Sequence, residues 1–598
     1  MRREVKRLSR SRTALFAVAI AALGPTLLSS PWADSHLGAH FVSQLLIVAV
    51  GLPCLIVLAR NAPLAALEPD ASKRSPPPSR GRRASGRQRP RALPARKVAP
   101  PVAQRDRVRL AALLAVGLGV WLLVATVLSP QPAVAFFGVQ ARANGALLGL
   151  ALVAAWAIGV SSGRDAAAAI ESVLLGVVGL NAIVALVQTI SGVGLASGRA
   201  QGLFGNPVFL AGLLSGGLWL VIQRFRTDQR WGWAVVLVVA ATQTTGSRFA
   251  LILLPVVVVA SFFVLTRRRT ALLVLAIVAG VGLGGGLAAV GGASSATARA
   301  GQGIAGGGFS QRLEIWSWSM HAIKHRPIQG QGPGQVQAAT ERFKTLAFSR
   351  HDPEPTFDDA HNLIVEYLVT TGVPGAALLI AFTVMTLLLA GWRSPLGGFA
   401  IFTLALHGVE PPHAELTPLL FLALGAAASG AAPLLIGVPR ALRPALVSVA
   451  VVVGGVIAVG SVYGTSSPST PSRAYADARI ARRLLPMWSS AYSRTGRIDV
   501  DHGKFKDAAR WLRIAAEREP YQAFLWSQLA FAEEQTGHVA DAEAHYRRAL
   551  EDNHYSVDTL NRLVALLVRN GRSQDARVYV QRSLQVTPNQ PSLRKLLQ

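Results

Sequence analysis

Four basic side chains in this sequence stand where polar segments meet long apolar runs. They are Arg142 in "QARANG", Arg248 in "TGSRFA", Arg312 in "QRLEIW" and His361 in "DDAHNL". A charge at the mouth of a membrane segment is costly unless it is paired or hydrated, so each is a candidate functional residue. Arginine binds phosphate oxygens through two parallel hydrogen bonds, and a neutral histidine can accept the proton of a hydroxyl group. Together, the four favour chemistry on an anionic, phosphate-bearing substrate.

Each of these residues has a structural alternative when it is considered alone. Arg142 could anchor a helix at the membrane interface, and Arg312 could be a hydrated loop charge. His361 could be a hydrogen-bonded residue at the start of a helix. Arg248 has the weakest alternative, because the turn between its two apolar runs is very short. Their joint occurrence on one face makes catalysis the better hypothesis.

The neighbours of His361 bear on its protonation. A helix dipole would keep the imidazole neutral, whereas Asp358 and Asp359 would favour the imidazolium, so the sequence leaves the direction of its pKa shift open. No cluster of carboxylates, or of cysteine and histidine, stands at metal-ligand spacing outside the apolar runs, and the single cysteine, Cys54, lies inside one. We therefore expect a metal-independent transfer from a phosphate leaving group, without a cofactor.

The elements that must position these residues are membrane helices. The chain has 598 residues, 51% hydrophobic and only 15% charged, whereas a soluble protein carries about a quarter charged residues. The pattern predicts an all-α, polytopic membrane bundle of about 12–13 helices. The expected spans are 13–30, 38–58, 109–128, 143–160, 167–187, 207–223, 233–245, 249–265, 271–291, 373–391, 396–408, 416–431 and 444–464.

Basic residues indicate how these spans are oriented. They concentrate in the first twelve residues, in 73–97 and in short loops such as 266–269. The positive-inside rule then places the N-terminus in the cytoplasm, and the four candidate residues and the C-terminal domain on the outer (periplasmic or extracellular) face. The net charge of +29 is explained by this orientation and by lipid contact. We expect no nucleic-acid partner, because no motif for one accompanies the charge.

The chain divides into four predicted parts, and the last contains a repeat. They are an N-terminal two-span unit (1–67), a disordered basic cytoplasmic linker (68–107), a membrane core (108–465) with a large outer loop (293–372), and a soluble tail (472–598). In the tail, small and large residues recur with a period of 34, for example Trp526, Gly537 and Ala542 against Leu560, Gly571 and Ala576. This period predicts three tetratricopeptide repeats from about residue 489, an α-solenoid suited to a protein partner.

Several segments of the core carry recognisable motifs. They are "GLFGNPVFLAGLL" (202–214), "TGSRFALI" (245–252), "RLEIWSWSMHAIKHRPIQGQGPGQ" (312–335) and "AHNLIVEYLVTTGVPGA" (360–376), with a looser one in "SPQPAVAFFGVQARANG" (129–145). In this order, over residues 129–376, they resemble the O-antigen ligase and polymerase superfamily of bacterial envelope glycosyltransferases. Members of this group also carry C-terminal tetratricopeptide repeats.

The resemblance implies a GT-C-like transferase in the bacterial inner membrane. Its donor would be a glycan on a polyprenyl diphosphate, and its acceptor a hydroxyl on a glycolipid, a glycan or a protein at the outer face. His361 would be the catalytic base, Arg248 and Arg312 would hold the diphosphate with Arg142 as a third contact, and attack would invert the anomeric carbon. Asn206, in the "GNP" segment, would contact the donor, or would only cap the helix that follows.

Three other functions compete with a glycan ligase. A repeat-unit polymerase and a protein O-oligosaccharyltransferase share the resemblance, and the sequence does not separate them. A transporter or a membrane scaffold that displays the repeats is the non-enzyme alternative. A transporter favours paired halves with polar sites near the membrane midplane, whereas the polar residues here gather at one face.

The segment after His361 is expected to be more than the start of a span. "NLIVEYLVTTG" predicts a helix at or near the membrane interface, and "GVPG" predicts a break before the span at 373–391.

Overall fold

The computed structural model describes residues 44–49, 51, 102–139, 142–301, 308–351, 357–414, 416–429, 456, 459–460, 463 and 470–597. The expected span at 13–30 and most of the linker at 68–107 lie outside these residues, as does nearly all of the span at 444–464. Within them the chain is helical, and its only strands are β1 (Leu195–Ala196) and β2 (Arg199–Ala200), which form a small antiparallel hairpin. The predicted all-α class is confirmed.

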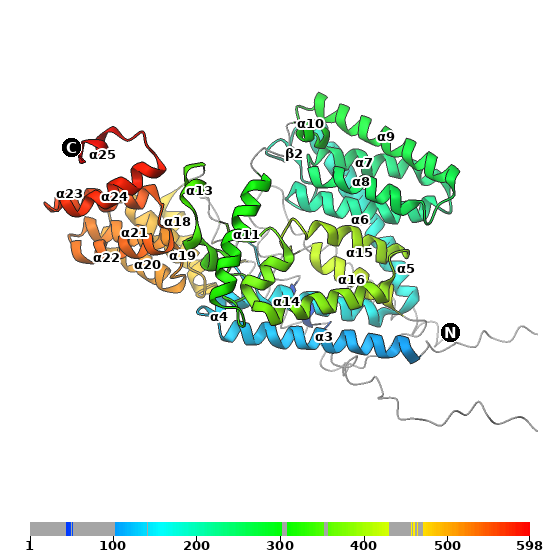
Figure 1. The fold of residues 1–598 in the computed structure, drawn as a ribbon, viewed down its shortest axis with the longest axis horizontal. Helices are drawn as coiled ribbons and strands as arrows, with labels where there is room; N and C mark the ends of the chain where they lie inside the picture. Colours follow the sequence, from blue (N-terminus) through cyan, green and yellow to red (C-terminus); the bar gives the residue numbers. More distant parts are fainter. Residues whose placement is uncertain are drawn as a thin grey trace, which may run out of the picture.

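The membrane part is a bundle of apolar helices (Figure 1). Its helices are α3 (Val102–Val127), α4 (Pro132–Phe137), α5 (Ala146–Ser191), α6 (Pro207–Phe225), α7 (Gly232–Thr244), α8 (Arg248–Ser261), α9 (Arg267–Val290), α14 (Leu363–Ala390), α15 (Pro395–Leu406) and α16 (Leu416–Ala428). Helix α5 packs on α16, α7 on α9, α3 on α14 and α6 on α15. Trp156, Trp219, Phe382, Phe399 and Phe421 are fully buried between them.

Six helical segments of the described chain are long and apolar enough to cross a membrane, and three apolar helices are shorter. Helix α5 supplies two of the six, which meet at a break at Gly163 (φ 78°, ψ 174°), between the two spans expected there. The short helices are α8, α15 and α16. The chain is a multi-pass membrane protein.

Helix α14 contains the break that "GVPG" predicts. Gly372 has φ 70° and ψ −175°, a conformation that costs glycine little. A Cβ atom there would lie 2.0 Å from the Ile328 carbonyl oxygen, so the position also requires a small residue. The break frees carbonyls of α14 for the loop after α11: Gln331 N donates to Val369 O and Gly332 N to Thr370 O. The segments expected at 362–372 and at 373–391 are thus one broken helix.

Four helices occupy the long segment between α9 and α14, and Figure 1 shows α11 standing between the membrane bundle and the C-terminal helices. The four are α10 (Ala296–Gly301), α11 (Gly308–His325), α12 (Val336–Thr340) and α13 (Leu346–His351). The C-terminal helices are α18 (Pro471–Leu484), α19 (Ser490–Asp501), α20 (Phe505–Arg518), α21 (Ala523–Gln535), α22 (Val539–Asp552), α23 (Val557–Arg569), α24 (Ser573–Val586) and α25 (Pro591–Lys595).

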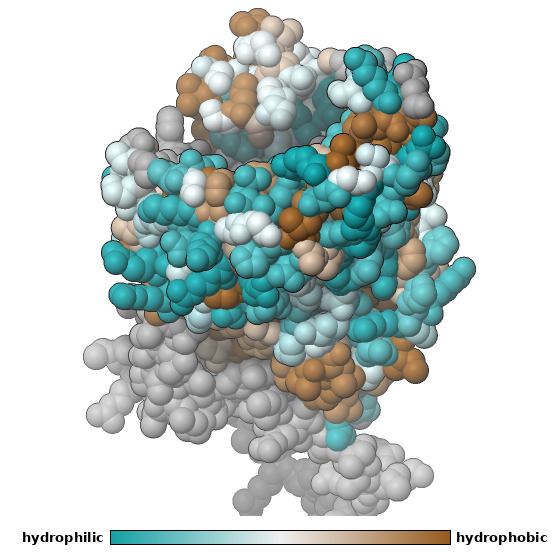
Figure 2. Space-filling model, turned by 90° about the vertical axis from the view of Figure 1, so that its left-hand side faces the viewer, coloured by the Kyte–Doolittle hydropathy of each residue, from teal (hydrophilic) through white to brown (hydrophobic). Residues whose placement is uncertain are grey.

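The pairs α19–α20, α21–α22 and α23–α24 are three packed helical hairpins, which confirms the predicted tetratricopeptide-like repeats. The recurring small residues Ala508, Ala542 and Ala576 lie at their contacts and are at most 1% exposed. Figure 2 looks onto this end of the molecule, and its surface is mostly hydrophilic. An aqueous environment suits such a surface.

Candidate functional site

His361 lies in the turn that leads into α14 and has an uncommon backbone. Its φ is +48°, in the left-handed region that few residues other than glycine adopt. The turn is fixed on both sides: His361 N donates to Asp359 Oδ1 (2.8 Å), and the Asn362 side chain caps α14 by accepting from Ile364 N and Val365 N. Such strain is retained where the surroundings hold it, often at functional sites.

Two neighbouring segments hold this turn in place. Trp316 Nε1, on α11, donates to the Ala360 carbonyl oxygen (2.9 Å). Asn362 Nδ2 donates to the Gly408 carbonyl oxygen (2.8 Å), and Leu363 N to that of His407 (2.9 Å), in the loop between α15 and α16. The His361 turn is therefore a junction of α11, α14 and the 407–415 loop.

The imidazole of His361 faces two carboxylates with one ring nitrogen. Nδ1 lies 3.0 Å from Asp359 Oδ1 and 3.7 Å from Glu410 Oε2, and the His361 side chain is 25% exposed. Because Nδ1 is turned to the carboxylates, Nε2 is the nitrogen left for a substrate. Burial opposes the charged ring, but the interactions with Glu410 and Asp359 outweigh it and raise the pKa of His361. The sequence left the direction of the pKa shift of His361 open, and in the structure the pKa is raised.

Glu410 connects His361 to the arginine of α11. Arg312 Nη2 lies 2.5 Å from Glu410 Oε1, and both side chains are mostly buried. Arg312 and Trp316 are one helical turn apart, so they face the same side of α11 and reach the same junction. Arg312 and His361 therefore share one carboxylate.

Arg142 is bound by the two aspartates that precede His361. Its Nε and Nη2 donate to the Asp358 carboxylate, both at 2.9 Å, and Nη2 also lies 3.0 Å from Asp359 Oδ2. Burial opposes the charge of Arg142, but the hydrogen bond and the charges of the aspartates raise its pKa above the usual range. Asp359 is 2% exposed, and this burial raises the pKa of its carboxyl group. Arg142 is thus part of the support of His361.

Arg248 belongs to a different cluster, at the turn between α7 and α8 and beside α10. Its Nε donates to the Arg299 carbonyl oxygen (3.0 Å). Arg299 Nη1 donates to Gly246 O (3.0 Å), and Arg199 Nε to Thr245 O (2.7 Å), so all three arginines meet at the turn between α7 and α8. None of the three forms an ion pair with a carboxylate of the described residues. We call Arg199, Arg248 and Arg299 the arginine cluster.

The electrostatics of the arginine cluster match this absence of ion pairs. Burial and the charge of Arg299 lower the pKa of Arg199 to about 10, and Glu410 partly opposes this. Burial and the charge of Arg248 lower the pKa of Arg299. Repulsion between like charges is relieved by an anion, so the cluster is suited to bind one. The charge of Glu410 thus links the arginine cluster electrostatically to the His361 junction.

Asn206 caps α6, as one of its two predicted roles states. Its Oδ1 accepts from Val208 N (2.8 Å), and Pro207 follows at the first helical position. Phe209, one turn later, packs against His413 of the 407–415 loop, with ring centroids 3.8 Å apart. Asn206 therefore lies near the junction with its side-chain oxygen committed to the backbone.

Three residues of the site were missed in the sequence: Arg199, Arg299 and Glu410. Glu410 had a usable signal, since "HGVEPPHAE" is a polar insertion between two apolar runs. Arg199 in β2 and Arg299 in α10 stand in short segments rich in Gly, Ala and Ser, with no such signal. Among the described residues, no group of three or more His, Cys, Asp or Glu side chains is arranged to hold a metal ion.

Comparison with known proteins supports the resemblance over part of the core. Residues 233–380 match the family model described as O-antigen ligase, which confirms the predicted similarity for that segment. This segment includes Arg248, Arg299, Arg312 and His361. The match supports membrane glycan transfer of the O-antigen ligase or polymerase type.

Other comparisons add little. No curated protein matches the chain. One solved structure that resembles it, titled the crystal structure of the APC/C hetero-tetramer Cut9–Hcn1, is 12% identical and covers 83% of this chain and 84% of its own, with a TM-score of 0.20. This score is too low to support an argument, so the repeat architecture rests on the helical hairpins themselves.

Proposed function

We propose that the chain transfers a glycan from a polyprenyl diphosphate to an acceptor hydroxyl at the outer face of a bacterial inner membrane. One observation carries this proposal. Nδ1 of His361 faces Asp359 and Glu410, which leaves Nε2 available, and the charge of Glu410 also acts on Arg199 of the arginine cluster, whose members have no carboxylate partner among the described residues. A base beside an anion site is the arrangement that transfer from a diphosphate requires.

The reaction follows from this arrangement. His361 Nε2 accepts the proton of the acceptor hydroxyl as its oxygen attacks the anomeric carbon. The new C–O bond forms while the bond to the diphosphate breaks, and the diphosphate leaves with the electron pair. The arginine cluster binds the diphosphate and stabilises the charge that develops on it. A single direct displacement inverts the anomeric configuration, and no metal ion takes part.

The supporting residues have separate roles in this proposal. Glu410 and Asp359 orient the imidazole and stabilise its protonated form. Arg312, paired with Glu410, contacts the donor near the bond that breaks. Arg142, predicted as a diphosphate contact, is engaged by Asp358 and Asp359. We therefore assign it to positioning the His361 turn.

Glycan profiles of a strain that lacks the gene test the proposal and its alternatives. Unligated lipid-linked polymer indicates a ligase, single unpolymerised units a polymerase, and missing protein glycans an oligosaccharyltransferase. Complementation with the wild-type gene restores the profile, whereas His361→Asn does not, at equal protein abundance in the membrane. An unchanged profile in the deletion strain would reject glycan transfer and favour a transporter or scaffold.

A further inference from the structure

Trp488, in the turn between α18 and α19, joins the repeat domain to the membrane core. It is 1% exposed, and its Nε1 donates to the Gly138 carbonyl oxygen (3.2 Å). Its ring meets the ring of Phe137, at the end of α4, edge to face with centroids 5.7 Å apart. An indole offers one hydrogen-bond donor and a large apolar surface, and here both are directed at the core. Trp488 therefore anchors the repeat domain to the end of α4.

The segment that Trp488 binds is the one that carries Arg142. Its described part (138–139 and 142–145) connects α4 to α5, and we call it the Arg142 loop. Gly138 has φ +88° and Ala143 has φ +49°. A left-handed backbone is uncommon for alanine and persists only where the surroundings hold it. The shape of the Arg142 loop thus depends on its contacts.

The repeat domain also covers the apolar side of the Arg142 loop. Ala143 and Leu147 of the core form one cluster with Leu485 and Trp488 of the repeat domain. All four are at most 2% exposed. Apolar surface at the edge of the membrane core would otherwise meet water, so this contact favours a fixed position of the repeat domain.

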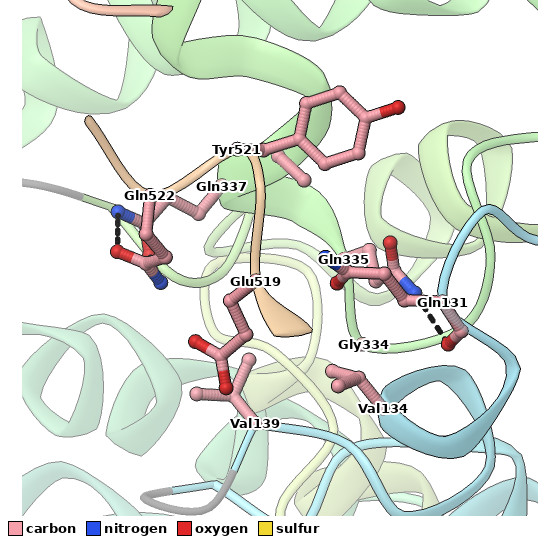
Figure 3. A pocket seen from close by; sticks show the side chains of 10 residues that line it. Gln131, Val134, Val139, Gly334, Gln335, Gln337, Glu519, Tyr521 and Gln522 are labelled. Carbon is pink, nitrogen blue, oxygen red and sulfur yellow. Dashed lines mark hydrogen bonds between the residues drawn. The ribbon is translucent and has the colours of Figure 1, made fainter. Parts of the chain in front are cut away.

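A second contact lies beside the first, at the turn between α20 and α21 (Figure 3). Glu519 of this turn lies near Val139 of the Arg142 loop, and its Oε1 accepts from Ser489 N (3.4 Å), the residue after the tryptophan. Gln522 of the same turn and Gln337 of α12 exchange two amide hydrogen bonds, at 3.2 and 3.1 Å. Two turns of the repeat domain therefore pack against the core at the Arg142 loop.

The core holds the Arg142 loop from its other side. Gln44 Nε2 donates to the Ala143 carbonyl oxygen (2.9 Å). Asn144 adds two longer hydrogen bonds, from Val139 N (3.3 Å) and to Glu366 Oε1 (3.5 Å). The carbonyl group at the start of the loop is instead bound by the repeat domain. The position of the loop is thus set by both domains together.

The Arg142 loop connects these contacts to the candidate base. Val139 O accepts from Arg142 N (2.9 Å), and Arg142 Nη2 lies 3.0 Å from Asp359 Oδ2. Asp359 Oδ1 accepts from His361 N (2.8 Å) and lies 3.0 Å from His361 Nδ1. The path from Trp488 to the carboxylate that orients the base therefore passes through one loop.

We infer that Trp488 is a positioning residue for the reaction. It holds the Arg142 loop and, through Arg142, the aspartates that orient His361. The role in catalysis rests on the proposed function, whereas the support of the Arg142 loop by the repeat domain does not. The repeat domain is then part of the framework of the reaction site, in addition to any partner that it binds.

Kinetics of the full-length protein in lipid nanodiscs test this role. Trp488→Ala should lower kcat about 10–100-fold and leave the donor KM unchanged, because a displacement of about 1 Å near the reacting groups can cost about 10²-fold. Trp488→Phe keeps an aromatic ring at the contact with Phe137 and should recover most of the rate. Trp511→Ala is the matched control and should keep the wild-type rate, since Trp511 packs within the first hairpin of the repeat domain.

A double variant distinguishes action through Arg142 from a general loss of stability. Two residues that act through the same contact have effects that do not multiply. Trp488→Ala combined with Arg142→Lys should therefore be no slower than the slower single variant. Effects that multiply would overturn the inference. A wild-type rate in Trp488→Ala, or an equal loss in Trp511→Ala, would overturn it as well.

Hydrogen–deuterium exchange of the same proteins gives a measurement that does not depend on transfer. Trp488→Ala should speed exchange at least about tenfold in residues 142–147 and 358–363, whereas Trp511→Ala should change exchange only within the repeat domain. Unchanged exchange in the Arg142 loop would overturn its support by the repeat domain. If exchange rises as expected while His361→Asn still transfers glycan, the proposed mechanism fails and the support of the loop stands.

Discussion

The two groups of arginines around the candidate site differ in their partners. Arg142 and Arg312 each bind a carboxylate close to His361, whereas Arg199, Arg248 and Arg299 are directed to backbone carbonyl oxygens or to one another. Both groups are equally basic in the sequence. The structure therefore separates arginines whose charge is paired with a carboxylate beside His361 from arginines without a carboxylate partner among the described residues.

The two groups of arginines should differ in anion binding because burial removes water from their charges. A partly buried cation without a counterion is destabilised, and a bound anion removes that cost. A cation already paired with a carboxylate gains less from a second anion. Binding of an anionic donor should consequently depend on the arginine cluster. The chemical step should depend on His361 and the residues that hold its turn.

The largest effect is expected from the base itself. Replacing His361 by Asn removes the proton acceptor but keeps a residue that tolerates positive φ, so the turn should survive. General-base catalysis contributes about 10²–10⁴-fold, and the transfer rate should fall by that factor with little change in donor KM. Rates measured with purified protein in lipid nanodiscs, at matched melting temperature, check this. Transfer within a few-fold of wild type would remove His361 from the mechanism.

The arginine cluster should respond differently. Arg248→Lys keeps the charge but loses the paired hydrogen bonds, each worth about 1.5–3 kcal/mol when charged, so kcat/KM for the donor should fall about 10–150-fold. Arg142→Lys should lower kcat without raising the donor KM, because Arg142 acts through the aspartates. Steady-state kinetics with varied donor distinguish the two. If Arg248→Lys and Arg142→Lys raise the donor KM equally, the two groups of arginines do not differ in donor binding.

The pH dependence of the rate provides a finer test. The imidazole acts as a base only when neutral, so activity should be lost as the pH falls through the pKa of His361. Asp359 and Glu410 raise this pKa and Arg312 opposes them, and the acid limb should therefore lie above the ordinary histidine value of about 6.5. Glu410→Gln removes one of the two carboxylates and should move the limb to lower pH. A limb that does not move would exclude Glu410 as the partner of the base.

Sequence patterns predicted the fold class and the repeats, and named Arg142, Arg248, Arg312 and His361, which the structure places at the candidate site. Apolar runs and the period of 34 are local signals, so they could be recognised without any contact. The partners of each arginine could not be recognised from the sequence, because they are distant along the chain. Arg142 meets Asp358 across 216 residues, and Arg312 meets Glu410 across 98. Glu410, Arg199 and Arg299 likewise become candidates for the site only through contacts that are distant in the sequence. Asn206 shows the reverse, since its capping hydrogen bond is local and was predictable.

The smallest expected effect concerns an acidic counterpart of the arginine cluster, at the contact between α12–α13 and the repeat domain. Glu341 binds Asn553 (3.2 Å) and Gln337 (3.1 Å) near Asp552, and burial raises the pKa of Glu341 to about 7 and that of Asp552 to about 6. The pKa values of both carboxyl groups are higher in the folded protein than in the unfolded chain. Between about pH 5 and pH 8 the folded protein therefore binds more protons than the unfolded chain. Stability should therefore fall as the pH rises from about 5 to about 8.

Glu341→Gln removes this titration and keeps the shape of the side chain. The variant should show a weaker decline of melting temperature between pH 5 and pH 8, by a few degrees, because a shift of about 1 kcal/mol moves a large domain by roughly that much. Glu517→Gln, at an exposed position of α20, is the control and should follow wild type. Identical pH profiles for Glu341→Gln and wild type would mean that these carboxylates are neutralised at the contact. Of the two sets of like charges, the arginine cluster and the pair Glu341 and Asp552, only the arginine cluster would then lack compensation without a bound anion.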